Sequence, residues 1–356
     1  MDQFEWKCMD KEIYQQIKAA WDHIAKPLDS MGTFEELLSR IGAIQGRRVP
    51  DLKKARLLVC CADNGIVEEG VSQSGQEITA ICAESIANGK SSAAIMAGTA
   101  GVDVMTLDVG INTDKKLENV RNVKIRKGTR NFRKEPAMTP DESMAAIRLG
   151  MDLVRESKEE GYSILCIGEM GIGNTTTSSA VTAALMKLPV KEVTGRGAGL
   201  DDEKLLHKQQ VIEEALAVYG YEDSISRETN SEQALDVLTK VGGLDIAVMA
   251  GICLGGAAYG VPIVLDGFIS LAAALVACRI KPVTKEYLIP SHSGKEPAMQ
   301  RIEEELSLTP VIYAHMALGE GTGAVMMMQL LKTANAVYEN SISFEKAGIA
   351  QYERYS

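Results

Sequence analysis

The chain has 356 residues, of which 46% are apolar and 24% are charged, a composition typical of a globular protein with one large domain and a small appendage. Its formal net charge of −10 argues against a nucleic-acid-binding protein, because such proteins normally present a basic surface. Small anionic substrates stay compatible with this charge, since local backbone amides can bind them.

The two ends of the chain are predicted to be helical. Residues 1–50 show helical periodicity without a strand pattern, and the tail after about residue 322 is helical too. The N-terminal stretch is acidic and polar, unlike a signal peptide. We therefore predict a small helical domain from residues 1–50 and 336–356, packed beside a large α/β domain of residues 51–335.

Five short apolar runs predict buried strands at residues 55–63, 103–110, 162–168, 261–266 and 287–291. Amphipathic or alanine-rich helical stretches separate them. Near-continuous apolar strands with helices between them predict an α/β fold, in which a mainly parallel sheet is covered by helices on both faces. In such sheets ligands bind beyond the C-terminal ends of the strands, so the loops that follow the strands are the candidate sites.

The segment GEMGIGNTTTSSA (168–180) contains a glycine-rich turn between a strand and a helix. We predict that the strand ends at Gly168 and that Asn174 or Thr175 caps a helix running to about Met186. A helix N-terminus offers free N–H groups and a positive dipole end, which suit a phosphate. The spacing matches a P-loop, but Asn174 replaces the lysine that would hold a triphosphate. The segment therefore predicts a monophosphate site, with a plain tight turn as the alternative.

A second glycine-rich loop, TGRGAGLDDEKLLHK (194–208), also precedes a helix. Asp201 is predicted to cap this helix, and Arg196, Lys204 and Lys208 are cations within reach of an anion. Two glycine-rich loops in one sheet protein indicate a ligand that contains a phosphate and a sugar.

Residues 246–265 contain no charged side chain, and their length alone would be enough to span a membrane. However, Gly260 and Pro262 are typical of the end of a helix. We therefore predict a buried helix to about Tyr259, then a buried strand, and no membrane span.

The segment HMALGEGTGAV (315–325) places Glu320 between Gly319 and Gly321. Flanking glycines leave room for a substrate, and apolar surroundings would raise the pKa of the carboxyl toward the working range of a general base. Glu169 is predicted to be a second loop carboxylate of this kind. A solvated glutamate in a turn is the alternative for Glu320.

Metal ligation and disulfide bonding have little support in the sequence. The four histidines form no H-x-x-x-H motif, and the odd number of cysteines contains no C-x-x-C motif. We predict that the cysteines are reduced and buried, as in a cytoplasmic protein, and that the chain binds no metal. The cysteines concerned are Cys8, Cys60, Cys61, Cys82, Cys166, Cys253 and Cys278.

Over roughly residues 25–335, the chain resembles the nicotinate-nucleotide–dimethylbenzimidazole phosphoribosyltransferase family. The shared motifs occur in the family's order: CADNGIVEEGVSQSGQEITA, LDVGI, GEMGIGNTTTSSA, KVGGLDIAVMAGICLGGAAYGVPIVLDGFIS, YLIPSH and LGEGTGA. The resemblance implies a Rossmann-like large domain, a small helical domain, a homodimer and no cofactor. It implies transfer of phosphoribose from nicotinate mononucleotide to a benzimidazole-type base, which gives α-ribazole 5′-phosphate and nicotinate in cobalamin nucleotide-loop assembly.

The resemblance also implies roles for individual residues. Glu320 matches the general base that removes the benzimidazole proton, and Glu169 is a second catalytic candidate. Residues that match nucleotide- or phosphate-binding positions are Gly171, Gly173, Asn174, Thr175, Thr176, Lys208 and Gly319. Residues that match positions around the acceptor base are Ser74, Cys82 and Met170.

Three positions depart from the family pattern: Asn64 replaces a histidine, Cys82 a glutamine that faces the base, and Ala317 an arginine. Loss of a polar partner at position 82 favours another acceptor, such as adenine, a different benzimidazole or a phenol. A P-loop-like kinase or hydrolase is an alternative that the absent lysine argues against. A non-catalytic nucleotide-binding protein is a further alternative, which the presence of Glu320 and Glu169 argues against.

Overall fold

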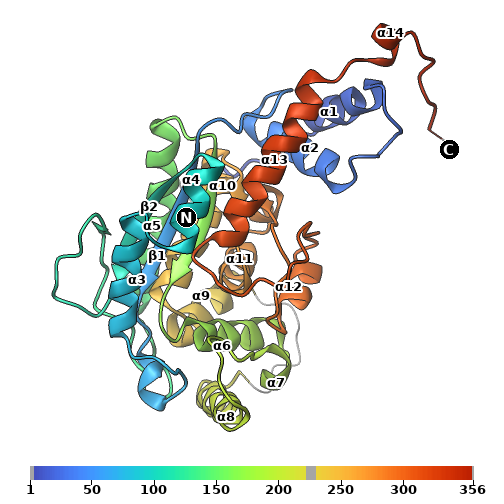
Figure 1. The fold of residues 1–356 in the computed structure, drawn as a ribbon. Coiled ribbons are helices and arrows are strands. Elements are labelled where there is room, and N and C mark those ends of the chain that lie inside the picture. Colours follow the sequence, from blue (N-terminus) through green and yellow to red (C-terminus); the bar gives the residue numbers. More distant parts are fainter. Residues whose placement is uncertain (1–3, 222–229, 355–356) are drawn as a thin grey trace.

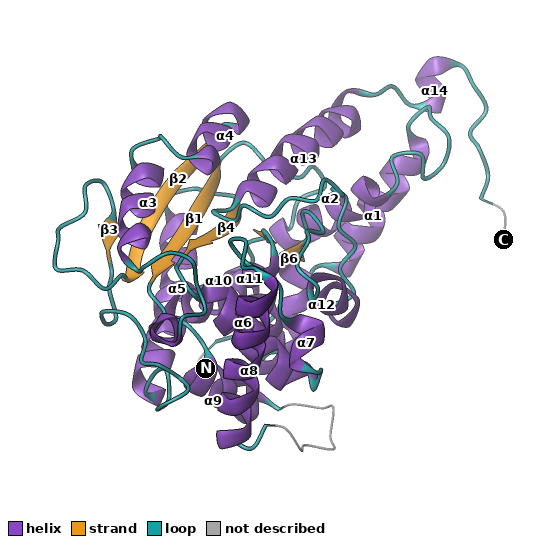
Figure 2. Ribbon diagram, turned by 60° about the horizontal axis from the view of Figure 1, so that its bottom comes forward, coloured by secondary structure: helices purple, strands orange, loops and turns teal. Residues whose placement is uncertain are grey.

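The computed structural model describes residues 4–221 and 230–354, and a parallel six-stranded sheet lies at its centre (Figures 1 and 2). The strands are β1 (Ala55–Ala62), β2 (Val102–Gly110), β3 (Arg121–Asn122), β4 (Ile164–Met170), β5 (Ile263–Val264) and β6 (Leu288–Ile289). Their spatial order is β3-β2-β1-β4-β5-β6, and every neighbouring pair is parallel. The order reverses between β1 and β4, which is where doubly wound sheets of this kind open a ligand crevice.

The α/β prediction and the five predicted strands are confirmed, with three differences. β5 and β6 are shorter than predicted, and β3 is an exposed polar pair, Arg121 and Asn122, with no apolar pattern to predict it. β4 continues past Gly168, because Glu169 and Met170 pair with the last residues of β1. The prediction that Glu169 lies in a loop is therefore wrong.

Helices cover both faces of the sheet (Figures 1 and 2). One face packs against a layer that includes α5, α10 and α11, and the other against α3, α4 and α13. The α-helices are α1 (Lys11–His23), α2 (Thr33–Gln45), α3 (Glu77–Ala87), α4 (Ser92–Ala100), α5 (Pro140–Glu159), α6 (Asn174–Met186), α7 (Val190–Val193), α8 (Asp202–Val218), α9 (Ser231–Val241), α10 (Leu244–Tyr259), α11 (Phe268–Ile280), α12 (Met299–Glu305), α13 (Thr322–Asn340) and α14 (Phe344–Ala347); short 3-10 helices are η1 (Gly65–Glu69) and η2 (Pro282–Tyr287).

β1 shows why a strand in this sheet must be apolar along its whole length. Leu58 and Cys60 point into the core on the α10 side, whereas Leu57 and Val59 point into the core on the α13 side. All four are fully buried, as expected for a strand with helices on both faces.

The apolar segment at 246–265 folds as predicted into a helix and a strand. α10 ends at Tyr259, and Gly260 closes it in the left-handed conformation, with φ of 67°. Within residues 4–221 and 230–354, we find no helix with the length and apolar character needed to cross a membrane.

Helices from the two ends of the chain, α1 and α2 with α13 and α14, lie together at one end of the molecule, whereas the two termini themselves lie apart (Figure 1). α13 runs from the sheet to the α1–α2 pair, where the rings of Trp21 and Tyr338 lie 4.8 Å apart. Buried side chains of α1 and α2 belong to the same core cluster as Leu57 of β1. The boundaries of a separate small domain stay a prediction.

The seven cysteines are free, and their reduced state stays a prediction. The prediction that they are buried is wrong for Cys8, which is exposed, and Cys82 is only half-buried. Cys8 lies in the polar segment before α1, where no apolar run surrounds it.

The contact between α5 and α10 is close enough to require glycine. An ideal Cβ on Gly150 would lie 2.1 Å from the Val248 carbonyl oxygen. We expect Gly150→Ala to lower the free energy of unfolding by about 1–3 kcal/mol, measured by chemical denaturation. Gly98→Ala is the matched control, because Gly98 lies in helix α4 with open space around its Cβ position. Equal stability of the two variants would contradict this account of the helix contact.

Candidate active site

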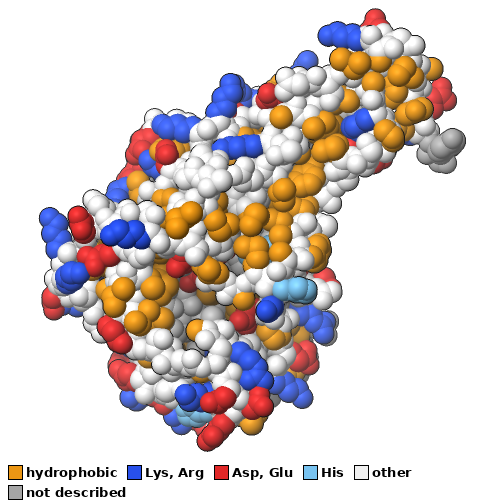
Figure 3. Space-filling view, viewed as in Figure 1, with side chains coloured by type: hydrophobic (Ala, Val, Ile, Leu, Met, Phe, Trp, Pro, Cys, Tyr) orange, Lys and Arg blue, Asp and Glu red, His pale blue; other side chains and the backbone are white. Residues whose placement is uncertain are grey.

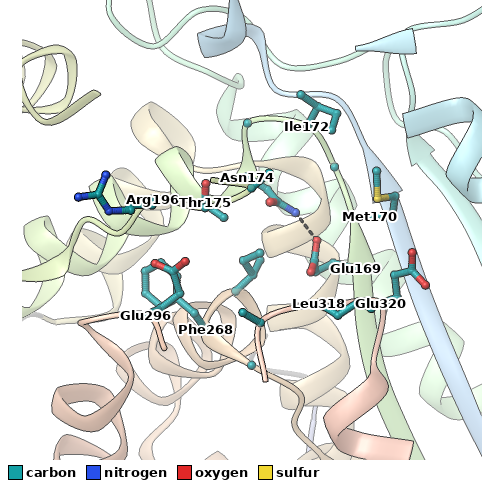
Figure 4. A pocket seen from close by; sticks show the side chains of 18 of the residues that line it. Glu169, Met170, Ile172, Asn174, Thr175, Arg196, Phe268, Glu296, Leu318 and Glu320 are labelled. Atoms are coloured by element: carbon teal, nitrogen blue, oxygen red, sulfur yellow. Dashed lines mark hydrogen bonds between the residues drawn. The ribbon is translucent and has the colours of Figure 1, made fainter. Parts of the chain in front are cut away.

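One cavity of about 260 Å³ opens beyond the C-terminal ends of β4, β5 and β6 (Figure 4). Its walls come from the β4–α6 turn, the loop before α8, the loops after β5 and β6, and the loop before α13. The location agrees with the prediction that the loops following the strands carry the site. It also matches the crevice expected where the strand order reverses.

The glycine turn after β4 forms one wall. Gly173 has φ of 93° and precedes α6, which begins at Asn174 and ends at Met186. The predicted cap by Asn174 or Thr175 is wrong, because Gly173 is the N-cap and no side chain caps this helix. Instead, the Asn174 side chain turns back toward β4, and Thr175 lines the cavity.

Lys208 extends from α8 to this wall and is 1% exposed. Its Nζ donates hydrogen bonds to the Thr175 hydroxyl at 2.9 Å and to the Gly195 carbonyl at 3.2 Å. Burial lowers its pKa to about 8, and the nearby Glu296 carboxylate opposes this shift. These two hydrogen bonds use two of the three N–H groups of the ammonium group, and Lys208 also lines the cavity.

The second glycine-rich loop contributes Arg196 and Gly197 to the cavity wall. Asp201 caps α8 as predicted, by accepting a hydrogen bond from the Lys204 N–H at 2.8 Å. Of the three cations predicted near the anion, Arg196 and Lys208 line the cavity, whereas Lys204 is exposed and does not.

Glu320 lies on the opposite wall, in a tight turn before α13 (Figure 4). Gly319, Glu320 and Gly321 have φ values of 83°, 60° and 89°, all in the left-handed region. The turn packs directly on β4, since an ideal Cβ on Gly168 would lie 2.5 Å from the Gly321 nitrogen. Asp266, after β5, fixes the same turn by accepting the N–H of Gly321 at 3.0 Å and that of Gly323 at 2.7 Å.

The Glu320 carboxyl has the character expected of a base. Burial raises its pKa, and hydrogen bonds from the Ser91 hydroxyl and the Ala93 N–H oppose the shift. Its Oε2 is buried and has no hydrogen-bond partner within the described part of the chain. A half-buried carboxyl that lines a cavity and has a raised pKa can act as a general base toward a bound molecule.

Glu169 lies between the two walls, near the end of β4, and is 7% exposed (Figure 4). Its Oε2 accepts a hydrogen bond from Asn174 Nδ2. Burial raises the pKa of Glu169 to about 8, and the neighbouring carboxyls Asp245, Asp266 and Glu320 add to the shift. The carboxyl is therefore mostly protonated at neutral pH.

The structure brings most of the predicted site residues together. Those that line the cavity are Glu169, Met170, Gly171, Gly173, Asn174, Thr175, Lys208, Gly319 and Glu320. Three do not line it: Thr176, Ser74 and Cys82. Thr176 is fully buried within α6. Ser72 and Gln73 line the cavity in place of their neighbour Ser74. Cys82 lies in α3 near Glu320, and the charge of Glu320 adds to the rise in the pKa of the Cys82 thiol.

Two buried carboxylates of the site were missed by the sequence analysis. Asp266 follows directly on the apolar run of β5, so its position at the strand end was an available signal. Asp245 lies in the first turn of α10, where nothing in the sequence links it to the β4–α6 turn. Asn64, one of the departures from the family pattern, does not line the cavity and instead accepts a hydrogen bond from the Thr177 hydroxyl at 3.2 Å.

One group of three carboxylates in the described residues could hold a metal ion, namely Asp22, Asp29 and Glu35. Arg354 pairs with both aspartates, and Lys26 lies 2.6 Å from Glu35. None of these residues lines the cavity. The cavity itself combines a glycine turn and a buried lysine with the half-buried Glu320 carboxyl on the facing wall.

Comparison with known proteins identifies similar chains. A family model described as "Phosphoribosyltransferase" matches residues 7–349. A nicotinate-nucleotide–dimethylbenzimidazole phosphoribosyltransferase of Clostridium acetobutylicum is 41% identical over 345 residues, which cover 97% of this chain and 96% of the relative. A protein of the same name from Ruminiclostridium cellulolyticum is 39% identical over 347 residues, with 98% and 96% covered.

A solved structure supports the same similarity in three dimensions. The crystal structure of CobT from Thermus thermophilus has a TM-score of 0.88 and 36% sequence identity. The match covers 96% of this chain and 100% of that chain.

Proposed function

The chain belongs to the phosphoribosyltransferase family, and from this premise we propose that its cavity holds a mononucleotide and an aromatic base side by side. The protein is a glycosyltransferase that moves the 5-phosphoribosyl group from nicotinate mononucleotide to a base of the dimethylbenzimidazole type. The products are α-ribazole 5′-phosphate and nicotinate, and the reaction activates the lower ligand of cobalamin.

One observation carries the assignment of this reaction to the cavity: the glycine turn at Gly173 and the residue Glu320 line the same cavity from facing walls. We assign the phosphate to the wall formed by Gly171, Gly173 and Thr175, where Lys208 supplies a cation. The N-terminus of α6 adds a positive dipole end on that side.

The acceptor base is assigned to the Glu320 wall. Met170 and Leu318 offer apolar contacts beside Glu320 and line the same cavity. Cys82 borders this wall without lining the cavity, so a larger polar side chain is absent at a position close to Glu320. This setting supports a planar, largely apolar acceptor with one ionisable N–H or O–H group.

The proposed chemical step is a single displacement at C1′ of the ribose. The attacking ring nitrogen forms a bond to C1′ while the bond from C1′ to the nicotinate nitrogen breaks, and its electron pair leaves with nicotinate. The other ring N–H of the acceptor becomes acidic as the first nitrogen attacks, and Glu320 takes that proton. Attack on the face opposite nicotinate converts the β-nucleotide into the α-product, and holding both molecules side by side lowers the entropic barrier.

This proposal is tested by incubating the protein with nicotinate mononucleotide and a panel of benzimidazoles, adenine and phenols, without added metal. We expect nicotinate release together with a riboside phosphate of one acceptor, identified by mass spectrometry. Nucleotide binding without product from any acceptor would contradict the assignment of the cavity as a transferase site.

We further propose that the enzyme is a homodimer in which a second copy covers an apolar face next to the cavity. Figure 3 shows apolar side chains gathered over α13 and its neighbours. Large exposed apolar side chains of α3, α4, α13 and the loop before α13 are Ile81, Ile95, Leu318, Met326 and Leu330. Contiguous exposed apolar surface of this kind is typical of protein interfaces. Sedimentation at micromolar concentration should give a dimer mass, and a monomer mass would contradict the proposal.

We also propose that the enzyme works in the cytoplasm. All seven cysteines are free, which is typical of proteins in a reducing compartment.

A further inference from the structure

Behind the cavity, three buried side chains from different elements form a hydrogen-bonded chain. Asn174 uses its single amide nitrogen to donate to Glu169 Oε2 on one side, as Figure 4 shows, and to Asp245 Oδ2, at 3.2 Å, on the other. Asn174 is 4% exposed and Asp245 is fully buried. The β4 strand, the α6 helix and the α10 helix are thus connected through two carboxyls and one amide.

Close backbone contacts hold this chain of groups in place. An ideal Cβ on Gly171 would lie 2.9 Å from Asp245 Oδ2, and one on Gly319 would lie 2.6 Å from Glu169 Oε1. Glu169 is therefore confined between the Asn174 amide and the turn that carries Glu320. A carboxyl confined in this way has one orientation relative to the cavity.

The surroundings of Glu169 are dominated by groups that are neutral or negative. Asp245 faces it from α10, Asp266 from the segment after β5, Glu320 from the turn before α13, and the thiols of β1 from the neighbouring strand. The cations and the imidazole that line the cavity are Arg196, Lys208 and His292. Asp63 adds a further buried carboxyl next to Asp245.

The two linked carboxyls differ in how well they can bear a negative charge. Asp245 accepts the Ile246 N–H at 3.0 Å and lies in the first turn of α10, where the helix dipole favours an anion. Burial raises the pKa of Asp245 only to about 6, whereas that of Glu169 rises to about 8. These contacts favour the negative charge on Asp245 and the proton on Glu169.

We propose that Asp245 is a positioning residue for this site, which orients Glu169 through the Asn174 amide and places a negative charge beside it. A protonated Glu169 donates a hydrogen bond into the cavity and does not repel an anionic nucleotide. The inference rests on the proposed function of the cavity, in which a phosphate and a nicotinate carboxylate enter beside several carboxyl groups.

The test is an infrared titration of the Glu169 carboxyl in the ligand-free protein. The protonated carboxyl band is assigned by its loss in Glu169→Gln, and we expect its midpoint near pH 8 in the unaltered protein. Asp245→Asn keeps the size of the side chain but removes a negative charge beside Glu169. It should therefore lower the midpoint of the Glu169 titration by about one pH unit. Glu303→Gln is the matched control, because Glu303 is also a buried carboxyl but contacts Ser293, outside this chain of groups.

A second variant gives the opposite expectation. Asn174→Leu removes the hydrogen bond that favours the ionised form of Glu169, so the midpoint should rise instead of falling. An unchanged midpoint in folded Asp245→Asn would overturn the proposal. Should that variant not fold, a midpoint in Asn174→Leu that stays unchanged or falls would overturn it.

Kinetics separate a positioning role from a merely structural one. In Asp245→Asn, Glu169 is ionised between about pH 7 and 8, where it is still protonated in the unaltered protein. We expect the KM for nicotinate mononucleotide to rise about fivefold or more in this window, with little change at pH 6. A rise of equal size at every pH would indicate general damage to the fold and contradict the proposal. Because the infrared titration needs no turnover, its outcome stays separate from a failure of the transferase assignment.

Discussion

We expect the Glu320→Gln variant to release nicotinate about 10²–10⁴-fold more slowly than the unaltered protein, with unchanged affinity for nicotinate mononucleotide. Glutamine has nearly the size of glutamate but cannot accept the acceptor's proton. The phosphate wall lies across the cavity from Glu320, so nucleotide binding should persist (Figure 4). Mass spectrometry of nicotinate measures the rate, and isothermal titration calorimetry measures the affinity.

The pH dependence gives an independent readout of the same role. The pKa of Glu320 is raised by burial, and the base must be ionised to act, so the rate of the unaltered enzyme should fall as pH drops through this pKa. The glutamine variant should lack that acid limb. Glu320→Asp serves as the control, since aspartate keeps a carboxylate and tolerates the left-handed backbone at this position. Equal losses in the aspartate and glutamine variants would contradict a role as the base.

The second large effect concerns the buried cation. Lys208→Met should weaken nicotinate mononucleotide binding about 10- to 100-fold, because a charge-assisted hydrogen bond to the phosphate is lost. The Thr175 hydroxyl and the Gly195 carbonyl also lose their shared donor. Lys204→Met is the matched control, since Lys204 lies one turn earlier on α8 and is exposed.

The pKa of Lys208 predicts the pH range in which nucleotide binding weakens. Only the protonated ammonium group attracts the phosphate, and burial lowers its pKa to about 8, so nucleotide affinity should fall as pH rises through that value. The methionine variant should lose this dependence along with the affinity. A Lys208→Met protein that binds as tightly as Lys204→Met would contradict the placement of the phosphate on this wall.

The strands and α10 were predictable because their physical signal is local. β1, β4 and α10 are apolar over many consecutive residues, and burial on both sides of a sheet demands this pattern. β3 was not predictable, since its two exposed residues are strand only through pairing with β2. In the same way, Glu169 belongs to β4 because of its pairing with Cys60 of β1.

In the candidate site, too, features with a local sequence signal were predictable, whereas features that depend on tertiary contacts were not. The turns that carry Gly173 and Glu320 were recognisable in the sequence, because tight turns of this kind need glycine at several positions. Asp245 is 71 residues beyond Asn174 in the chain, and their contact exists only after α6 and α10 have packed. Thr176 was predicted to bind phosphate from its place in a motif, but the turn of α6 directs it into the core. Motifs therefore predict backbone turns better than the direction of each side chain.

The most direct test of the central claim is the configuration at C1′ of the product formed by this protein. Nicotinate mononucleotide and the acceptor identified in the panel are incubated with excess enzyme, and the riboside phosphate is analysed by nuclear magnetic resonance. A single displacement in the cavity predicts one equivalent of nicotinate and an α-riboside phosphate. A β-riboside phosphate, or ribose 5-phosphate without a coupled base, would contradict it.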